Sequence, residues 1–250
     1  MIYFVGAGPG DPELITLKGY RLLQEADLVL YTGSLINPEL LQYVGEGTRT
    51  IDSSSHDLNS LVKTMEEAYA GGEKVVRLHT GDASIYGAIG EQMTELEKRG
   101  TTCALVPGIS SFLAAAASLR REYTVPEGSQ TIIITRREGR TPVPSAERIE
   151  TLAPHQASMV IFLSAGMVDK VQEELLEGYP PHTPVAVIYK ASWPDEKVVT
   201  GSLEELSRLT EEAGITKTAL ILVGDFLRES GRSYLYDQNF EHGYREKENG

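Results

Sequence analysis

Short apolar runs alternate with amphipathic helical patterns along the first half of the chain, and this alternation restricts the possible folds more than any other feature. Runs rich in Val, Ile and Leu predict strands at Ile2–Val5, Asp27–Leu30, Lys74–Leu78 and Thr102–Val106. The spacing of apolar residues predicts helices between these strands, at Thr16–Glu25, Asn59–Ala70 and Ile89–Lys98. This β-α-β-α order favours a mostly parallel sheet that is covered by helices.

The second half repeats the alternation with more strands. Strands are predicted at Thr131–Thr135, Met159–Leu163, Val185–Tyr189, Val198–Thr200 and Ala219–Val223, and helices at Val168–Leu176 and Leu203–Ala213. Ser202 and Glu205 are spaced as a capping box for the last helix. A Pro194-Asp195 turn between two strand-like runs predicts a hairpin, and hence a mixed sheet.

A change of composition near residues 112–125 separates the two halves. The apolar segment Phe112–Leu119 is followed by Arg120-Arg121-Glu122 and then by Pro126-Glu127-Gly128. We therefore predict an α/β protein with an N-terminal domain at 1–115 and a C-terminal domain at 116–236. We expect the active site in the cleft between the domains, where ligand sites are favoured. The polar tail 237–250 is predicted to be disordered.

Charge and cysteine content narrow the class of protein. The formal net charge of −13 argues against nucleic acid as a partner, because phosphate contacts require basic surfaces. The single cysteine, Cys103, allows no intrachain disulfide and lies in an apolar run, so we expect it to be buried. No His or Cys spacing suggests a metal site. The chain shows neither a secretory leader nor an apolar run long enough to span a membrane, so we expect a cytoplasmic protein.

Glycine-containing loops follow three of the predicted strands in the first half, at Gly6–Asp11, Gly81–Gly87 and Pro107–Ser111. Strands of one parallel sheet end at the same edge, so these loops are expected to lie together there. The first loop fails the dinucleotide fingerprint, because Asp11 stands where the third glycine belongs. Each loop also has a simpler interpretation, as a tight turn or as a helix cap.

Arginines are dense between positions 120 and 140, a window that holds five arginines against three glutamates and is therefore net +2. Guanidinium groups bind carboxylates in a bidentate manner, so a polycarboxylate ligand is one interpretation and a solvated surface is the other. The five histidines form no catalytic pattern by spacing. His79 is of most interest, because it precedes the Gly81 loop.

The three loops together resemble the signatures of the tetrapyrrole methylases. Gly6–Gly19, Val76–Ala88 and Val106–Ser111 are similar to the first, second and third signatures, and the likeness extends over residues 1–225. The segments Arg136–Pro144 and Asp52–His56 resemble the branch of the family that methylates C11 of precorrin-4 or cobalt-precorrin-4 in cobalamin biosynthesis. The resemblance implies two α/β domains that clasp S-adenosylmethionine (SAM), a tetrapyrrole substrate, S-adenosylhomocysteine as product, and a homodimer.

The resemblance also implies site residues. Matched by motif, the SAM-binding residues are Pro9, Gly81, Asp82, Ala83, Ile85, Ser110, Ser111, Phe162, Leu163, Tyr189, Ala191, Thr218 and Ala219. Asp82 is the candidate for a catalytic role. Substrate carboxylates are assigned to Arg120, Arg136, Arg137 and Arg140. Ala83 stands where the family usually has proline, which loosens this loop and restores a backbone amide.

Methyl transfer from a sulfonium to an electron-rich ring carbon requires alignment and exclusion of water, and neither a covalent nucleophile nor a metal. This fits a sequence without a nucleophile–base pattern. Three alternatives stay open: a tetrapyrrole methylase that acts at another ring position, a relative that methylates ribosomal RNA or a protein, and a SAM- or tetrapyrrole-binding carrier without turnover.

Overall fold

The computed structural model describes residues 1–33, 35–126 and 128–228, which form two compact units. The first unit holds Met1–Ala115 together with Lys190–Glu196. The second holds Ala116–Tyr189 and the described residues from Lys197 onward. The division therefore falls inside helix α4 (Ser111–Leu119). The predicted polar tail at 237–250 lies outside the described residues.

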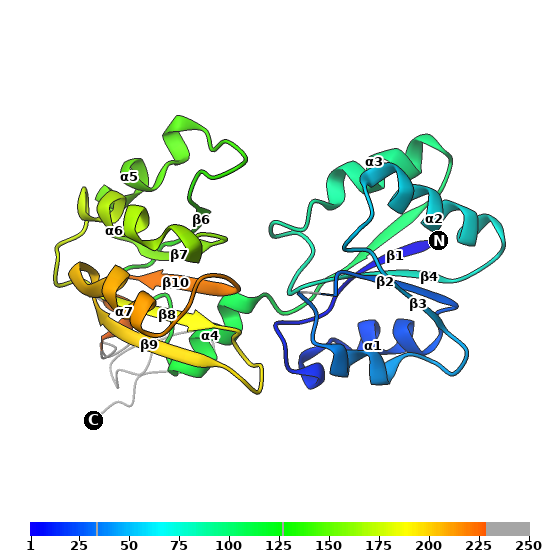
Figure 1. Ribbon diagram of the computed structural model, residues 1–250, viewed down its shortest axis with the longest axis horizontal. Coiled ribbons are helices and arrows are strands. Elements are labelled where there is room, and N and C mark those ends of the chain that lie inside the picture. The colour runs from blue at the N-terminus through cyan, green and yellow to red at the C-terminus, as the bar shows by residue number, and fades with distance from the viewer. Residues whose placement is uncertain (34, 127, 229–250) are drawn as a thin grey trace, which may run out of the picture. The chain divides into compact units, whose positions relative to one another are not determined.

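The first unit is built on a five-stranded sheet in the order β3-β2-β4-β1-β5 (Figure 1). Every pairing between these strands is parallel, as predicted for this half. The strands are β1 (Ile2–Gly6), β2 (Leu28–Tyr31), β3 (Arg49–Asp52), β4 (Val75–His79) and β5 (Cys103–Val106). The helices are α1 (Leu17–Gln24), α2 (Leu58–Ala70) and α3 (Ile89–Lys98).

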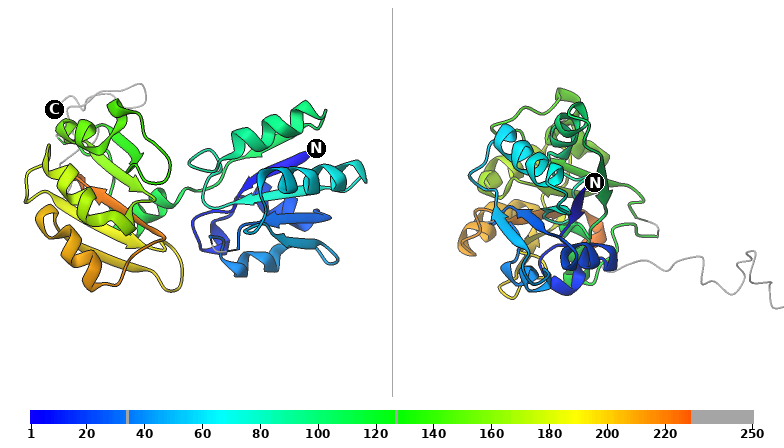
Figure 2. Two further views of the ribbon diagram at one scale, coloured as in Figure 1. Left: turned by 45° about the horizontal axis from the view of Figure 1, so that its top comes forward. Right: turned by 90° about the vertical axis from the view of Figure 1, so that its right-hand side faces the viewer.

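Helices cover both faces of the first sheet, which explains why the central strands read as continuous apolar runs. Helix α1 lies on one face, where Leu22 and Leu23 pack with Val29 and Val76 (Figures 1 and 2). Helices α2 and α3 lie on the other face. The core there contains Ile2, Phe4, Leu28, Leu30, Leu61, Val62, Met65, Ala68, Val75 and Leu96.

Strand β3 was not predicted, and its residues explain why. Ile51 is its only apolar residue, and Arg49, Thr50 and Asp52 are exposed at the edge of the sheet. A single inward side chain leaves no periodic signal. The helix starts predicted at Thr16 and Asn59 lie within one residue of the observed starts of α1 and α2. Thr16 and Asp57 cap these helices by accepting hydrogen bonds from Gly19 N and Ser60 N.

The second unit contains a mixed sheet in the order β6-β7-β10-β8-β9. Strands β6 and β7 are parallel and the other neighbours are antiparallel, which confirms the predicted mixed sheet. The strands are β6 (Ile132–Arg136), β7 (Ser158–Phe162), β8 (Pro184–Tyr189), β9 (Lys197–Ser202) and β10 (Ala219–Val223). The helices are α5 (Ile149–Leu152), α6 (Val168–Leu176) and α7 (Leu206–Glu212).

One face of this sheet packs on α5, α6 and α7 through a core that includes Ile149, Val171, Leu175, Leu206 and Ile221. The predicted capping box is present, with Glu205 bonded to both the amide and the hydroxyl of Ser202. The helix predicted at Leu203–Ala213 begins as a 3₁₀ turn at Leu203–Glu205 and continues as α7. Among the described helices, none has both the length and the apolar character that crossing a bilayer requires.

Candidate functional site

The three glycine-containing loops of the first unit meet at one edge of its sheet. They follow β1, β4 and β5, and these strands are neighbours because β1 pairs with both β4 and β5. Gly8 and Gly81 exchange two backbone hydrogen bonds, of 3.2 Å from Gly8 N and 2.8 Å from Gly81 N. The structure therefore joins the first and second loops directly.

Glycine is required where the third loop joins the other two. A Cβ atom on Gly108 would lie 2.2 Å from the carbonyl oxygen of Gly81, and one on Gly6 would lie 2.6 Å from the backbone of Gly108. Both distances are shorter than any normal contact, so side chains are excluded at these positions. Backbone therefore packs on backbone at this edge, which leaves peptide groups close to whatever binds there.

Asp82 ties the second loop to the third. Its Oδ2 atom accepts a hydrogen bond of 2.8 Å from Gly108 N, and its Oδ1 atom accepts bonds from the amide, at 2.8 Å, and the hydroxyl of Ser84. Partial burial raises the pKa of Asp82, but the bonds from Ser84 and Gly108 outweigh it and hold the pKa below its ordinary value. Asp82 is therefore an ionised residue that positions two loops, and it has no proton to give near neutral pH.

A segment from the β8–β9 connection holds the first loop, and sequence reasoning did not find it. The indole N–H of Trp193 donates a hydrogen bond of 3.0 Å to the carbonyl oxygen of Pro9, and Asp11 N donates one of 3.0 Å to Ser192 Oγ. A Cβ atom on Gly10 would lie 2.0 Å from Trp193 Cδ1, so the ring packs against a residue without a side chain. The only hint in the sequence is that Trp193 is the single tryptophan.

The SAM-binding residues predicted in the first unit all lie on or beside these loops. Pro9, Gly81, Ala83 and Ser110 are buried, Asp82, Ile85 and Ser111 are partly exposed, and Ala191 is buried in the 190–196 segment. Among the described residues, the Ala83 amide has no hydrogen-bond acceptor, so the amide restored by the absence of proline is unused within the loop.

The residues predicted in the second unit lie along one edge of its own sheet. The register pairs Arg136 with Phe162 and Ala219 with Tyr189, and β10 lies between β7 and β8. Leu163 and Thr218 flank this edge with positive φ angles of 53° each. Leu163 is also 70 % exposed. Strained, exposed backbone of this kind occurs preferentially at ligand sites.

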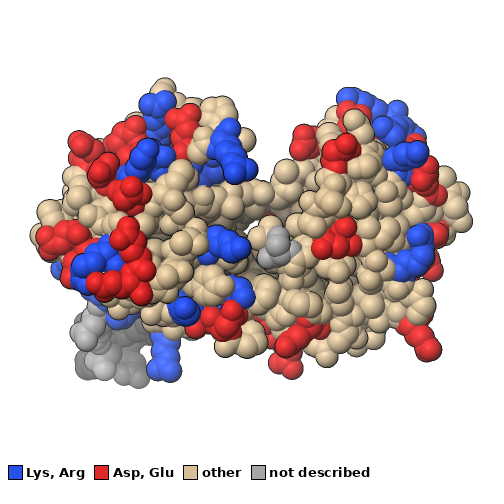
Figure 3. Space-filling view, in the orientation of Figure 1, with Lys and Arg blue, Asp and Glu red and all other residues tan. Residues whose placement is uncertain are grey.

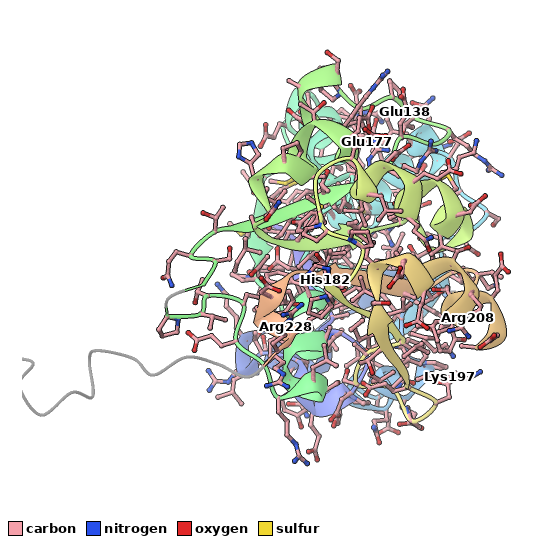
Figure 4. All side chains as sticks on the ribbon, turned by 90° about the vertical axis from the view of Figure 1, so that its left-hand side faces the viewer. Glu138, Glu177, His182, Lys197, Arg208 and Arg228 are labelled. Atoms are coloured by element: carbon pink, nitrogen blue, oxygen red, sulfur yellow. The ribbon has the colours of Figure 1, made fainter. Side chains whose placement is uncertain are left out.

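Two of the predicted substrate arginines have partners within the second unit. Arg137 forms an ion pair with Glu174 at 2.7 Å, and Arg136 donates to the carbonyl oxygens of Thr141 and Pro142 at 3.3 and 2.9 Å. Arg136 therefore shapes the loop after β6, where Glu138 also lies (Figure 4). Arg120 and Arg140 are exposed.

Lysine and arginine side chains are interspersed with acidic ones on the face of the second unit drawn in Figure 3. Several of these charges form ion pairs, as Arg208 does with Glu205 and Glu212 on α7. Among the described residues, no group of three or more His, Cys, Asp and Glu side chains comes together in a way that suits a metal ion.

Comparisons with known proteins identify the family of this chain. The family model of the Tetrapyrrole (Corrin/Porphyrin) Methylases matches residues 1–207. The chain is 53 % identical over 247 residues to the cobalt-precorrin-4 C(11)-methyltransferase of Methanocaldococcus jannaschii. The alignment covers 98 % of this chain and 95 % of that protein.

Two solved structures are similar as well. The X-ray structure of a cobalamin biosynthetic enzyme, cobalt precorrin-4 methyltransferase, matches with a TM-score of 0.89 and 44 % identity, and covers 91 % of this chain and 96 % of that one. Uroporphyrin-III C-methyltransferase from Thermus thermophilus, complexed with S-adenyl homocysteine, matches with a TM-score of 0.75 and 29 % identity, over 91 % and 93 % of the two chains. The family model spans most of the chain and the first relative nearly all of it, so this chain belongs to the tetrapyrrole methylase family.

Proposed function

We propose that this protein transfers a methyl group from SAM to C11 of cobalt-precorrin-4 or precorrin-4 during cobalamin biosynthesis. The observation that carries the proposal is the joined edge of three loops, in a chain more than half identical to a relative of that name. S-adenosylhomocysteine is the second product.

The first-unit loops suit SAM on structural grounds. They offer an ionised carboxylate at Asp82, hydroxyls at Ser110 and Ser111, and the unused amide of Ala83. A ligand with an ammonium group, a carboxylate and ribose hydroxyls complements this set of charges, donors and acceptors. The loops hold no repeated glycine turn at a helix N-terminus of the kind that binds a pyrophosphate, which agrees with the failed dinucleotide fingerprint.

The reaction requires correct positioning of the methyl donor and the acceptor, and it does not require acid–base catalysis. SAM, when bound, supplies a methyl group that its sulfonium already activates. Asp82 keeps the second and third loops at a fixed separation, and Trp193 keeps the first loop in place. Rigid loops of this kind hold a donor in line with an acceptor and exclude water, and such alignment lowers the barrier without a catalytic proton.

The second unit contributes the remaining contacts in this proposal. Phe162, Leu163, Tyr189, Thr218 and Ala219 complete the SAM site, and the exposed Arg120 and Arg140 bind substrate carboxylates. Arg136 and Arg137 act chiefly by holding the loop after β6 in shape, because their guanidinium groups already have partners. We further propose a cytoplasmic homodimer that does not bind nucleic acid, in line with the net charge of −13.

The test is incubation of the purified protein with SAM and each of the two tetrapyrroles, followed by mass spectrometry. The proposal expects one added methyl group per tetrapyrrole and an equal amount of S-adenosylhomocysteine. Binding of both ligands without a mass change would instead indicate a carrier, and methylation of RNA or protein alone would contradict the assignment.

A further inference from the structure

Arg77 is a charged side chain inside the first unit. It lies on β4, the central strand of the sheet, and it is only 5 % exposed. Val75 and His79 lie on the same face of β4, since side chains alternate along a strand, and Val75 belongs to the core under α2 and α3. The guanidinium is therefore held at a buried position close to the carboxyl end of the strand.

Among the described residues, the hydrogen bonds of this guanidinium go to neutral hydroxyl groups. Its Nη1 atom donates to Ser53 Oγ at 2.9 Å and its Nη2 atom to Thr32 Oγ1 at 3.3 Å, while its Nε atom has no partner among the described residues. Asp52, the last residue of β3, accepts hydrogen bonds from Gly33 N and Ser54 N instead. Burial lowers the pKa of Arg77 to about 10, so the group stays charged at neutral pH.

Two histidines, one on β4 and one in the loop after β3, also have a buried nitrogen without a hydrogen-bond partner among the described residues. These nitrogens are His79 Nε2 and His56 Nδ1. His79 follows Arg77 on β4, and His56 belongs to the loop that carries Ser53, whose carbonyl oxygen accepts from His56 N at 3.0 Å. A buried water can accept or donate a hydrogen bond at each of these histidine nitrogens. A water cannot balance the charge of the Arg77 guanidinium, because it is neutral.

The order of the strands places this cluster beside the loops assigned to SAM. Those loops follow β4, β1 and β5, which form one half of the sheet. Arg77 lies in the middle of β4, and its partners Thr32 and Ser53 directly follow β2 and β3, which form the other half together with β4. Strand β4 is common to both halves, because it carries Arg77 and leads into the Gly81 loop. A methyl acceptor that rests on the second half would meet the donor at β4.

We propose that Arg77, with Ser53 and Thr32, is a subsite for one carboxylate of the tetrapyrrole substrate. This inference rests on the proposed function, which supplies a ligand with several carboxylates on flexible arms. An arm can enter where a ring cannot, and a carboxylate accepts two parallel hydrogen bonds from a guanidinium. The incoming carboxylate balances the charge of Arg77, which forms no ion pair with a described acidic residue.

The first arm of the test measures the subsite without the substrate. Thermal unfolding midpoints of the full-length protein are compared in sodium propionate and in sodium chloride at equal ionic strength, for the wild type, Arg77→Met and Arg99→Met. Arg99 is a matched control, because its guanidinium is paired with Glu66 at 2.8 Å, between α3 and α2. Propionate should raise the midpoint of the wild type and of Arg99→Met relative to chloride, and should leave Arg77→Met unchanged. The same response in all three proteins would overturn the subsite.

The second arm measures ligands by calorimetry, with SAM and with uroporphyrin, a stable tetrapyrrole that bears acetate and propionate arms. Arg77→Met should weaken uroporphyrin binding about tenfold or more, which is the scale of one charge-assisted contact, and leave SAM binding unchanged. Equal losses for both ligands would mean that Arg77 is merely structural. Unchanged uroporphyrin binding would also overturn the proposal.

Arg77→Lys covers the case in which Arg77→Met does not fold. It keeps the charge but loses the planar fork, so it should show a propionate response smaller than that of the wild type. A response equal to or larger than that of the wild type would overturn the subsite. The protein could also show a propionate effect that depends on Arg77 and yet methylate no tetrapyrrole. That result would support the anion site and contradict the proposed function.

Discussion

The indole nitrogen of Trp193 lies 3.0 Å from the carbonyl oxygen of Pro9, although the two residues are 184 positions apart in the chain. Both belong to the first unit, because the segment Lys190–Glu196 packs there, while the strands on either side of it belong to the second unit. Lys190 lies 4.7 Å from the centre of the indole ring and forms an ion pair with Asp195 at 2.7 Å. The first loop is thus held by the segment Lys190–Glu196, which is itself stabilised by the contacts of Lys190 with Trp193 and Asp195.

Replacing Trp193 by phenylalanine should weaken SAM binding by about threefold to tenfold, because one hydrogen bond contributes about 0.5–1.5 kcal/mol. The aromatic body still fills the space over Gly10, so we expect the fold to persist. Titration calorimetry with SAM measures the change. Ser192→Ala, which removes the acceptor for Asp11 N, should act in the same direction, and normal SAM binding by both variants would show that this segment does not hold the site.

Gly108→Ala should lower the free energy of unfolding by more than about 2 kcal/mol, because overpacking against backbone cannot relax by a rotamer change. The new methyl group would lie 2.2 Å from Gly81 O. Gly90→Ala is the matched control. A Cβ atom at Gly90, in α3, meets nothing within 4 Å, so alanine should stabilise the helix by about 1 kcal/mol. Urea unfolding measures both values, and equal effects would contradict the close packing of the loops.

Asp82→Asn should separate the positioning role of Asp82 from a catalytic one. Asparagine can accept from Ser84, but its NH₂ group cannot accept from Gly108 N, so about 1–3 kcal/mol of stability should be lost. The affinity for SAM should fall, and the turnover at saturating SAM should fall by no more than about tenfold. A far larger loss of turnover with unchanged SAM affinity would mean that the carboxylate takes part in the chemistry.

Because His79 is buried, we predict that the free energy of unfolding depends on pH in a specific way. Burial, and then the neighbouring charge of Arg77, lowers the pKa of His79 to about 3 in the folded protein, against 6.5 as the ordinary value. Above pH 6.5 both the folded and the unfolded forms are neutral. Between pH 6.5 and 3 the unfolded chain binds a proton that the folded chain does not, so stability falls as the pH falls, at up to about 1.4 kcal/mol per pH unit.

The experiment for His79 is urea unfolding between pH 8 and pH 4, with His79→Gln beside the wild type. The glutamine variant should lose less stability than the wild type below pH 6.5, and the difference between the two should be constant above pH 7. His182→Gln, at an exposed position, is the control and should follow the wild type. Parallel curves for the wild type and His79→Gln would show that His79 does not titrate on unfolding.

The sequence predicted those parts of the fold that depend on local periodicity. Buried strands such as β1 and β4 are predicted by their apolar runs, and the Ser202–Glu205 capping box is predicted by the spacing of its two residues. The edge strand β3 has one inward side chain and left no signal. Likewise, the meeting of three loops followed from the rule that parallel strands end at one edge.

What the sequence could not predict depends on contacts between distant segments. Nothing in the composition of Lys190–Glu196 indicates that it packs with Gly10, or that the predicted substrate arginine Arg137 is paired with Glu174. The sequence gives no reason to distinguish Arg77 from other charged residues of the second signature. Its role is indicated only by its burial and by its hydrogen bond to a neutral hydroxyl group. The positive φ angles of Leu163 and Thr218 are equally invisible, since neither residue is glycine.

The most direct measurement of the central claim is NMR of the tetrapyrrole product formed with SAM that carries a ¹³C-labelled methyl group. The proposed function predicts a single labelled methyl signal that correlates with C11 of the macrocycle, in an amount equal to the S-adenosylhomocysteine released. A labelled methyl group on a different ring carbon, or no label in the tetrapyrrole while SAM is consumed, would contradict it.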